Sequence, residues 1–356
     1  MRRAPRLAAY CLVANRDDRS LGVVDLARFR LRKPIPLDAA PAAVLAHPTQ
    51  PKVFVLAPQA GVVYEIDAGM LSVSRRVRVG TVAVQMQMSP RQDALWVLMR
   101  DPAALVELPL DTLRPRRRIR LSVLPDHFDL CENRAAVAGL AERSIVLASL
   151  DRAAVERTVV SGSEPSIVRF RKDGSQLIAG SRPGRDVTIF DVATGRTVVR
   201  MPLAIEPRYF CFKADGGQLY ITGDGLDAVV VVYPFQTEVA ETVLAGHAPG
   251  AMAFAASQPS YLLVANPQDN GVTILNFDEM GTKLVATVQV GEAPRYILTT
   301  PDNDYALVLD EVSGDLAVIW LESLKQRRFT RPAAVFTLIP VGHGPVSAAV
   351  VVLHRG

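Results

Sequence analysis

Cysteine is scarce in this chain, and the few cysteines are far apart. Only three occur among 356 residues, namely Cys11, Cys131 and Cys211, and none shows CxxC or CxxCH spacing. That pattern excludes a zinc ribbon, covalently attached haem and a complete disulfide framework. No apolar run reaches the roughly 18 residues that a membrane helix needs. The sequence therefore predicts a soluble globular protein.

The basic stretches contain none of the interleaved aromatic residues that stack on bases. The formal net charge is +4 and the pI about 9.0, and much of the excess lies in residues 1–6 and in Arg114–Arg120. Without aromatic partners these clusters do not indicate nucleic-acid binding. An arginine-rich outer strand is typical of a solvated sheet edge that is protected from pairing. We therefore predict no nucleic-acid partner and no membrane insertion.

The chain does contain a repeat. The phrase Gly291–Asn303 recurs as Ile205–Gly216 and as Ser163–Gly174. A short apolar strand accompanies each repeat, at a spacing of about 42 residues, which is typical of four-stranded propeller blades. The eight such strands are Tyr10–Asn15, Val53–Ala57, Leu95–Met99, Ala136–Leu140, Leu177–Ser181, Leu219–Gly223, Tyr261–Asn266 and Tyr305–Asp310.

Each apolar strand is followed by further β-rich runs separated by turn residues, with no helical periodicity. We therefore predict an all-β fold, a β-propeller of eight four-stranded blades, with seven blades as the alternative. Ser347–Leu353 matches the innermost strand, so the N- and C-terminal strands should share one blade. The predicted organisation is an N-terminal extension, 1–7, and a single propeller domain, 8–356. An insertion at Ser323–Pro332 is interpreted as a long outer hairpin or a partner-docking loop.

Several units resemble the YVTN-type repeat of bacterial YncE-like β-propellers. The residues that carry the resemblance are Gln218–Gly223, Val229–Tyr233, Pro249 with Met252–Ala256, Phe190-Asp191 and Asp173-Gly174. The resemblance implies the propeller fold over almost the whole chain. Members of this family resemble lactonases and cofactor-bearing dehydrogenase subunits in architecture. A shared propeller does not transfer chemistry.

The loops before the innermost strands hold the candidate site residues. They should converge into a charged funnel and comprise Asp126, His127, Glu164, Glu206, Arg208, His247, Glu292, Arg295 and His343. The first interpretation is a non-catalytic scaffold that binds a small polar or anionic ligand or a protein partner, with repeat-encoded side chains pairing around the rim. A lactonase-like hydrolase would instead use Glu206 or Glu292 as general base and Arg208 or Arg295 on an oxyanion. A third possibility is a propeller subunit that docks to a redox partner.

Three of the five histidines fall in these loops, and a metal site would combine His127, His247 and His343 with a carboxylate. Because they belong to the third, sixth and eighth units, we predict no metal and no cofactor. The compartment is open. The given sequence shows no convincing signal peptide at its start, which favours the cytoplasm. Members of the family are often exported, which favours the periplasm or secretion if the start is truncated.

Overall fold

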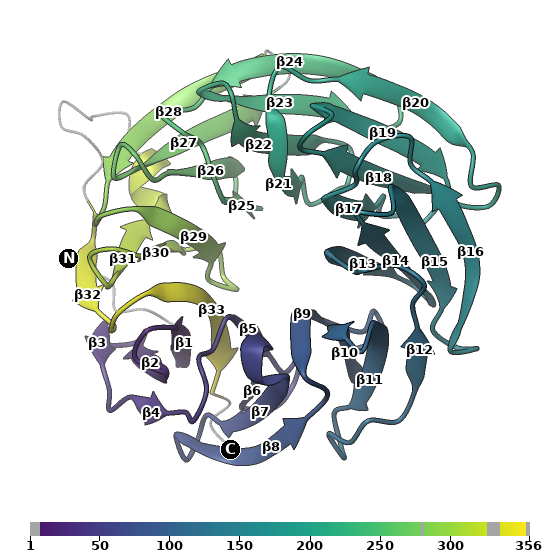
Figure 1. Cartoon of the computed structure of the whole chain (residues 1–356). Helices are drawn as coiled ribbons and strands as arrows, with labels where there is room; N and C mark the ends of the chain where they lie inside the picture. Colours follow the sequence, from purple (N-terminus) through teal and green to yellow (C-terminus); the bar gives the residue numbers. More distant parts are fainter. Residues whose placement is uncertain (1–7, 279–280, 326–334, 354–356) are drawn as a thin grey trace. The chain divides into compact units, whose positions relative to one another are not determined.

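The computed structural model describes residues 8–278, 281–325 and 335–353 (Figure 1). These residues form eight antiparallel sheets of four strands, with one further short strand, β4 (Ile35–Pro36), paired to β2. The predicted all-β class and the eight-bladed β-propeller are confirmed, and the seven-blade alternative is wrong. The predicted extension 1–7 and most of the predicted insertion lie outside the described residues. Among the described residues, no helix is long and apolar enough to span a membrane.

The chain divides into two compact units, which are described separately. The first unit comprises residues 1–55, 64–76 and 243–356, and the second comprises 56–63 and 77–242. Each sheet has an inner strand, which follows the loop we call the leading loop, and an outer strand at its opposite edge. Figure 1 draws β9, β13, β17 and β21 on one side of the sheets of the second unit and β12, β16, β20 and β24 on the other.

The sheets of the second unit, from inner to outer strand, are β9 (Val82–Met88), β10 (Ala94–Asp101), β11 (Ala104–Pro109) and β12 (Arg118–Arg120); β13 (His127–Cys131), β14 (Arg134–Gly139), β15 (Ser144–Ser149) and β16 (Ala154–Val160); β17 (Ile167–Phe170), β18 (Gln176–Ser181), β19 (Asp186–Asp191) and β20 (Thr197–Pro202); and β21 (Glu206–Phe212), β22 (Leu219–Asp224), β23 (Ala228–Tyr233) and β24 (Glu238–Leu244). The end of β24 passes into the first unit.

The remaining sheets are β25 (Met252–Ala255), β26 (Tyr261–Asn266), β27 (Gly271–Asp278) and β28 (Gly281–Gln289); β29 (Pro294–Thr299), β30 (Tyr305–Asp310), β31 (Asp315–Trp320) and β32 (Thr337–Pro340); β33 (Pro345–Val352), β1 (Ala9–Asn15), β2 (Ser20–Asp25) and β3 (Arg30–Leu31); and β5 (Ala43–Ala46), β6 (Lys52–Ala57), β7 (Val62–Asp67) and β8 (Ser72–Arg78). Two 3-10 turns, η1 (Pro58–Ala60) and η2 (Leu321–Lys325), complete the described elements.

The two ends of the chain share one sheet, as predicted. Strand β33 pairs antiparallel with β1, with Tyr10 opposite Val351 and Val13 opposite Ala348. The leading loop of this sheet therefore comes from the C-terminal part of the chain, and its remaining strands come from the N-terminal part.

The core lies between the faces of neighbouring sheets. In the second unit, Ile145 and Leu147 of β15 belong to one buried cluster with Phe170 of β17 and Phe190 of β19. β-Branched and aromatic residues suit this packing because both faces of the second and third strands are covered. Phe190 is only 2% exposed, and burial of such a side chain contributes roughly 1.5–3 kcal/mol.

The arginine-rich stretch is an outer edge, as predicted. Strand β12 pairs only with β11 and exposes Arg118 and Arg120 on either side of the buried Ile119. Charged side chains on such an edge oppose pairing with another sheet.

Candidate functional site in the leading loops

Three leading loops of the first unit share the pattern Gly-x-x-Pro. Gly246 and Gly342 have positive φ angles, and each lies against a buried asparagine: a Cβ there would be 2.7 Å from Nδ2 of Asn266 and 2.4 Å from Nδ2 of Asn15, respectively. Only glycine allows this approach. Asn15 in turn donates a hydrogen bond from Nδ2 to the carbonyl oxygen of Val341 at 2.6 Å. The repeat thus fixes the backbone of the leading loops and leaves the intervening side chains free to vary.

The Pro-Arg-Tyr phrase encodes a β-bulge in two inner strands. In β21 the register passes from Pro207 opposite Gly223 to Tyr209 opposite Thr222, so that Arg208 has no partner in the ladder. In β29 the same shift leaves out Arg295. A bulge re-aims the side chain of its extra residue, and both arginines are exposed. The two copies of the Pro-Arg-Tyr phrase therefore place an exposed arginine where each of these two inner strands begins.

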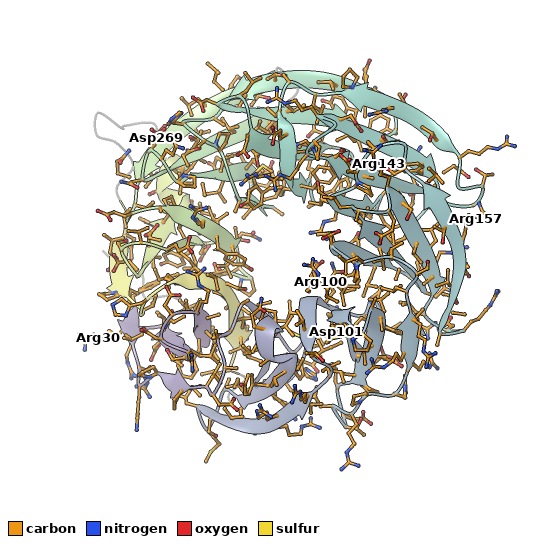
Figure 2. All side chains as sticks on the ribbon, viewed as in Figure 1. Arg30, Arg100, Asp101, Arg143, Arg157 and Asp269 are labelled. Atoms are coloured by element: carbon orange, nitrogen blue, oxygen red, sulfur yellow. The ribbon has the colours of Figure 1, made fainter. Side chains whose placement is uncertain are left out.

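In the second unit, the predicted carboxylates form a repeated ion pair between successive sheets. An arginine at or just after the end of the second strand of one sheet contacts an acid at or just before the start of the inner strand of the next sheet. The nitrogen–oxygen distances are 3.0 Å for Arg100–Asp126, 2.6 Å for Arg143–Glu164 and 3.6 Å for Arg185–Glu206. Figure 2 labels two of these arginines, Arg100 and Arg143. Because all three pairs are partly exposed, each contributes only about 0.2–1 kcal/mol.

Arginines and carboxylates of two neighbouring sheets share ion pairs where β18 and β22 end. The guanidinium of Arg208 is 2.5 Å from a carboxylate oxygen of Asp224, and that of Arg182 is 3.8 Å from the same oxygen. Arg185 pairs with Glu206, and Nε of Arg182 is buried without a hydrogen-bond partner. Among the described ion pairs, three guanidinium groups therefore contact the two carboxylates of Asp224 and Glu206.

His127 serves as a structural acceptor in β13. Its Nδ1 accepts a hydrogen bond from the backbone N–H of Val168 at 3.4 Å, while Asp129, two residues on, accepts from the N–H of Phe170 at 2.8 Å and pairs with Arg169 at 2.9 Å. Burial, assisted by the Arg169 guanidinium, lowers the pKa of His127 to about 3. A neutral imidazole engaged in this way binds β13 to β17.

In the first unit, Arg295 belongs to an ion network. Its Nε lies 2.6 Å from Glu311, which also accepts from Arg16 at 3.0 Å, and Arg16 contacts Asp17 at 2.9 Å. Glu292 uses its backbone N–H to bond Ser313 Oγ at 2.9 Å, and its side chain is exposed. Arg295 and Glu292 are thus near in sequence but do not form a pair with each other.

The remaining two histidines are held by aspartates. The backbone N–H of His247 donates to Asp269 at 2.6 Å. His343 donates its backbone N–H to Asp18 at 2.7 Å, and its Nδ1 lies 2.8 Å from the other oxygen of that carboxylate. The described residues include no group of three or more His, Cys, Asp or Glu side chains that could hold a metal ion.

Among the described residues, the acids and arginines of the hydrolase prediction do not pair with each other. Glu206 pairs with Arg185 rather than with Arg208, and Arg295 pairs with Glu311 rather than with Glu292. A general base has to reach a proton on the nucleophile while a cation reaches the developing oxyanion. Glu206 and Arg295 are thus engaged in ion pairs with other residues, Arg208 pairs with Asp224, and the side chain of Glu292 is exposed.

Asp310 is a buried acid that was not predicted as a site residue. It ends β30 at the place where β1 and β26 have Asn15 and Asn266, and it is fully buried. Its Oδ2 accepts from the N–H of Gly291 at 3.0 Å, and its Oδ1 has no hydrogen-bond partner. Burial, with a small addition from Asp315, raises the pKa of Asp310 to about 7. The sequence signal was present, because an acid replaces an amide within an aligned repeat.

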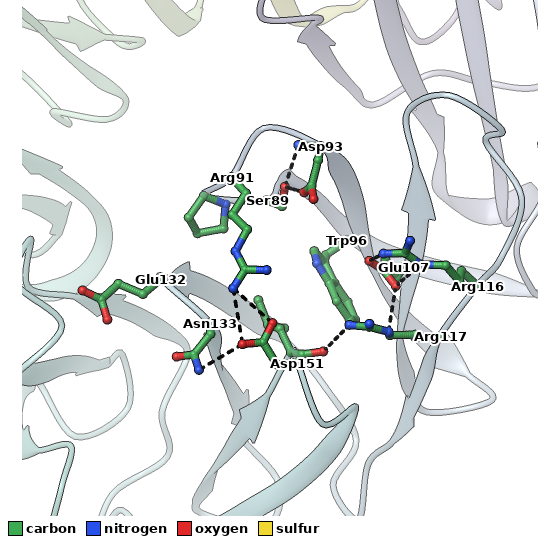
Figure 3. A pocket seen from close by; sticks show the side chains of 12 residues that line it. Ser89, Arg91, Asp93, Trp96, Glu107, Arg116, Arg117, Glu132, Asn133 and Asp151 are labelled. Carbon is green, nitrogen blue, oxygen red and sulfur yellow. Dashed lines mark hydrogen bonds and ion pairs between the residues drawn. The ribbon is translucent and has the colours of Figure 1, made fainter.

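A small pocket lies at the opposite ends of the strands, between the sheets of β9–β12 and β13–β16 (Figure 3). Its volume is about 70 Å³. Glu107, which is 4% exposed, pairs with Arg116 at 2.5 Å and with Arg117 at 3.6 Å. Arg117 also donates to the Leu150 carbonyl of the next sheet at 3.0 Å. The pocket is therefore a polar junction between sheets. The arginine-rich stretch was predicted to be wholly solvated, and this was wrong for Arg116 and Arg117. The sequence did not indicate that both arginines pair with the buried Glu107.

Comparison with solved structures shows the fold. Neither a protein-family model nor a curated protein matches the chain. It is similar to hydrazine synthase of Kuenenia stuttgartiensis, with 19% identity and a TM-score of 0.63 over 79% of this chain and 95% of that one. It is similar to the dihydro-heme d1 dehydrogenase NirN, solved in complex with DHE, with 16% identity and a TM-score of 0.79 over 98% and 77%. A functionally unknown protein from Desulfotomaculum acetoxidans matches with 10% identity and a TM-score of 0.60 over 98% and 99%. At these identities the likeness extends to the fold alone.

Proposed function

We propose that the chain is a non-catalytic binding scaffold whose leading loops bind a small anionic or polar ligand. The observation that carries the proposal is the pairing of the predicted site charges: Glu206 and Arg295 each have their own ion-pair partner. Such pairs hold the loops in place, and a rigid loop surface reduces the entropy lost on binding.

The cluster of Arg182, Arg208 and Asp224 favours a ligand with a negative charge. Two guanidinium groups share one carboxylate, and the Nε of Arg182 is unsatisfied. A carboxylate or phosphate group could accept from both arginines, because guanidinium groups present donors in a planar fork. An anion is therefore favoured over a cation at this end of the second unit.

Thermal denaturation in the presence of malonate, citrate or glucose 6-phosphate tests the proposal. We expect at least one of these anions to raise the melting temperature of the parent, and glucose to have no effect. The Arg182→Gln/Arg208→Gln variant should lose the protection, and the control Arg120→Gln, on the outer strand β12, should keep it. Absence of protection by every anion, or equal protection of the double variant, would contradict the proposal.

Two alternatives have narrower support. A lactonase-like hydrolase needs one of the paired carboxylates to be released by substrate. The second alternative is a subunit that docks to a redox partner. It is suggested by two solved structures of similar fold, which are named as a hydrazine synthase and a dihydro-heme d1 dehydrogenase. Membership of the YVTN-type, YncE-like group belongs to the same proposal, and it rests on the repeat phrases themselves.

A further inference from the structure

A second cleft lies on the outer part of the second unit, apart from the leading loops. It lies between the sheet that ends in β16 and the turn after β19 in the next sheet, and its volume is about 400 Å³. The residues that line it are Arg134, Leu147, Arg152, Ala154, Val155, Glu156, Arg157, Val192 and Ala193. Arg152 and Arg143 stand at opposite ends of β15, so the cleft is remote from the Arg143–Glu164 pair.

The cleft has an excess of positive charge. Of its three arginines, Arg134 lies 3.5 Å from Glu156, the single acid of the lining. Within the described parts of the chain, Arg152 and Arg157 have no carboxylate within ion-pair distance. Asp191 lies nearby and accepts the hydroxyl and the N–H of Thr194, at 2.6 and 2.7 Å. These hydrogen bonds, with a smaller attraction to the Arg157 guanidinium, lower the pKa of Asp191.

Arg157 is positioned by the neighbouring sheet. Its side chain lies over Gly195 in the β19–β20 turn, where a Cβ would come within 2.8 Å of the guanidinium. The φ of Gly195 is +72°, so the turn and the contact both favour glycine. Figure 2 labels Arg157 on the outer strand β16. A guanidinium supported on one side by a backbone turn needs little ordering to bind an anion on the other.

The rest of the cleft wall is apolar. Val192 is 6% exposed and belongs to the core cluster that also contains Leu147. Val155, on the outer strand, is 40% exposed beside the arginines. Clefts that join an apolar wall to a few charged groups are the common form of small-molecule sites.

We propose that this cleft binds a small organic anion. The carboxylate or phosphate group would lie between Arg152 and Arg157, and a short apolar body would lie against Val155 and Val192. Two unpaired guanidinium groups supply charge-assisted hydrogen bonds to the anion, and the valines account for a preference for an organic over an inorganic ligand. This site is independent of the one proposed in the leading loops.

Isothermal titration calorimetry with phenyl phosphate, benzoate and inorganic phosphate tests the site. Phenyl phosphate or benzoate should bind the parent, and inorganic phosphate should bind more weakly than phenyl phosphate. The Arg152→Gln/Arg157→Gln variant should lose about tenfold or more in affinity, since hydrogen bonds to charged groups are removed. The Glu156→Gln variant should bind the organic anions about threefold more tightly than the parent. The change removes the only acid among the residues that line the cleft and frees Arg134 from its ion pair.

The matched control removes two unpaired exposed arginines elsewhere, Arg30→Gln/Arg120→Gln, and should bind within about twofold of the parent. Binding that is equal in the Arg152→Gln/Arg157→Gln variant, or equally weakened in the control, would overturn the site. Absence of binding of both organic anions to the parent would also overturn it. Equal affinity for phenyl phosphate and inorganic phosphate would overturn its assignment to an organic ligand. Which of the two organic probes binds better identifies the head group.

Discussion

Replacing Asp310 by asparagine should stabilise the protein at neutral and alkaline pH. Asp310 is fully buried, and one of its carboxylate oxygens has no hydrogen-bond partner. Asn15, at the equivalent end of β1, instead donates to the Val341 carbonyl. In the Asp310→Asn variant the amide oxygen can keep the hydrogen bond from Gly291, and the NH₂ group carries no charge into the core. The change therefore gives β30 the asparagine that ends β1 and β26.

The magnitude follows from the pKa. Burial raises the pKa of Asp310 from 3.8 to about 7, and each pKa unit corresponds to about 1.4 kcal/mol. Between these two values the folded state binds the proton and the unfolded state does not. The contribution of Asp310 to stability is therefore fully present below about pH 4 and is lost as pH rises through 7, by a total of about 4 kcal/mol. The advantage of the asparagine variant should be near zero at pH 4 and about 4 kcal/mol at pH 8.

Urea denaturation followed by circular dichroism, at intervals from pH 4 to 8, measures this difference. Comparing the variant with the parent cancels the pH dependence of groups other than Asp310, including His127. The mirror variant Asn266→Asp places an acid at the same position of the neighbouring sheet and should lose stability as pH rises. A pH-independent difference, or an asparagine variant less stable than the parent at pH 8, would refute the reasoning.

Three further predictions concern the other charged groups. His127 should stay neutral to about pH 4 in NMR titration, because its folded-state pKa is about 3; its contribution to stability is present above about pH 6.5 and is lost as pH falls toward 3. Arg116→Ala should destabilise by about 1–3 kcal/mol in chemical denaturation, because the buried Glu107 loses the nearer of its two arginines, which is itself half exposed, and keeps only Arg117. A loss below about 0.5 kcal/mol would contradict this expectation. A double-mutant cycle on Arg185 and Glu206 should give a coupling below about 1 kcal/mol that falls with salt, and a larger, salt-independent value would contradict the partly exposed pair.

The sequence predicted the architecture because the repeat is periodic. The spacing of the apolar strands identified eight blades, and the match of Ser347–Leu353 to an inner strand identified the pairing of β33 with β1. The Pro-Arg-Tyr phrase predicted Arg208 and Arg295 in loops before inner strands, and this was wrong, because both lie within the first residues of β21 and β29. Their position at a β-bulge depends on the register of the ladder, which the phrase does not specify.

The partners of the site residues could not be predicted. Asp126 and Glu164 pair with arginines of the preceding sheet, and no feature of the repeat phrase specifies that choice. His127 was expected at a rim, whereas burial against β17 makes it a structural acceptor. The cleft at Arg152 was not predicted. It lies between the outer strand of one sheet and a turn of the next sheet, and the repeat pattern shows only that both segments are polar, not that they are neighbours.

The central claim is that the charged leading loops form a binding scaffold rather than a catalytic centre. The most direct test is the rate of hydrolysis of an aryl ester and a γ-lactone by the purified parent and by the Glu206→Gln/Glu292→Gln variant. We predict equal rates for the two proteins, indistinguishable from the uncatalysed rate. Turnover by the parent that falls by about a hundredfold or more in the variant, the effect expected for loss of a general base, would contradict the claim.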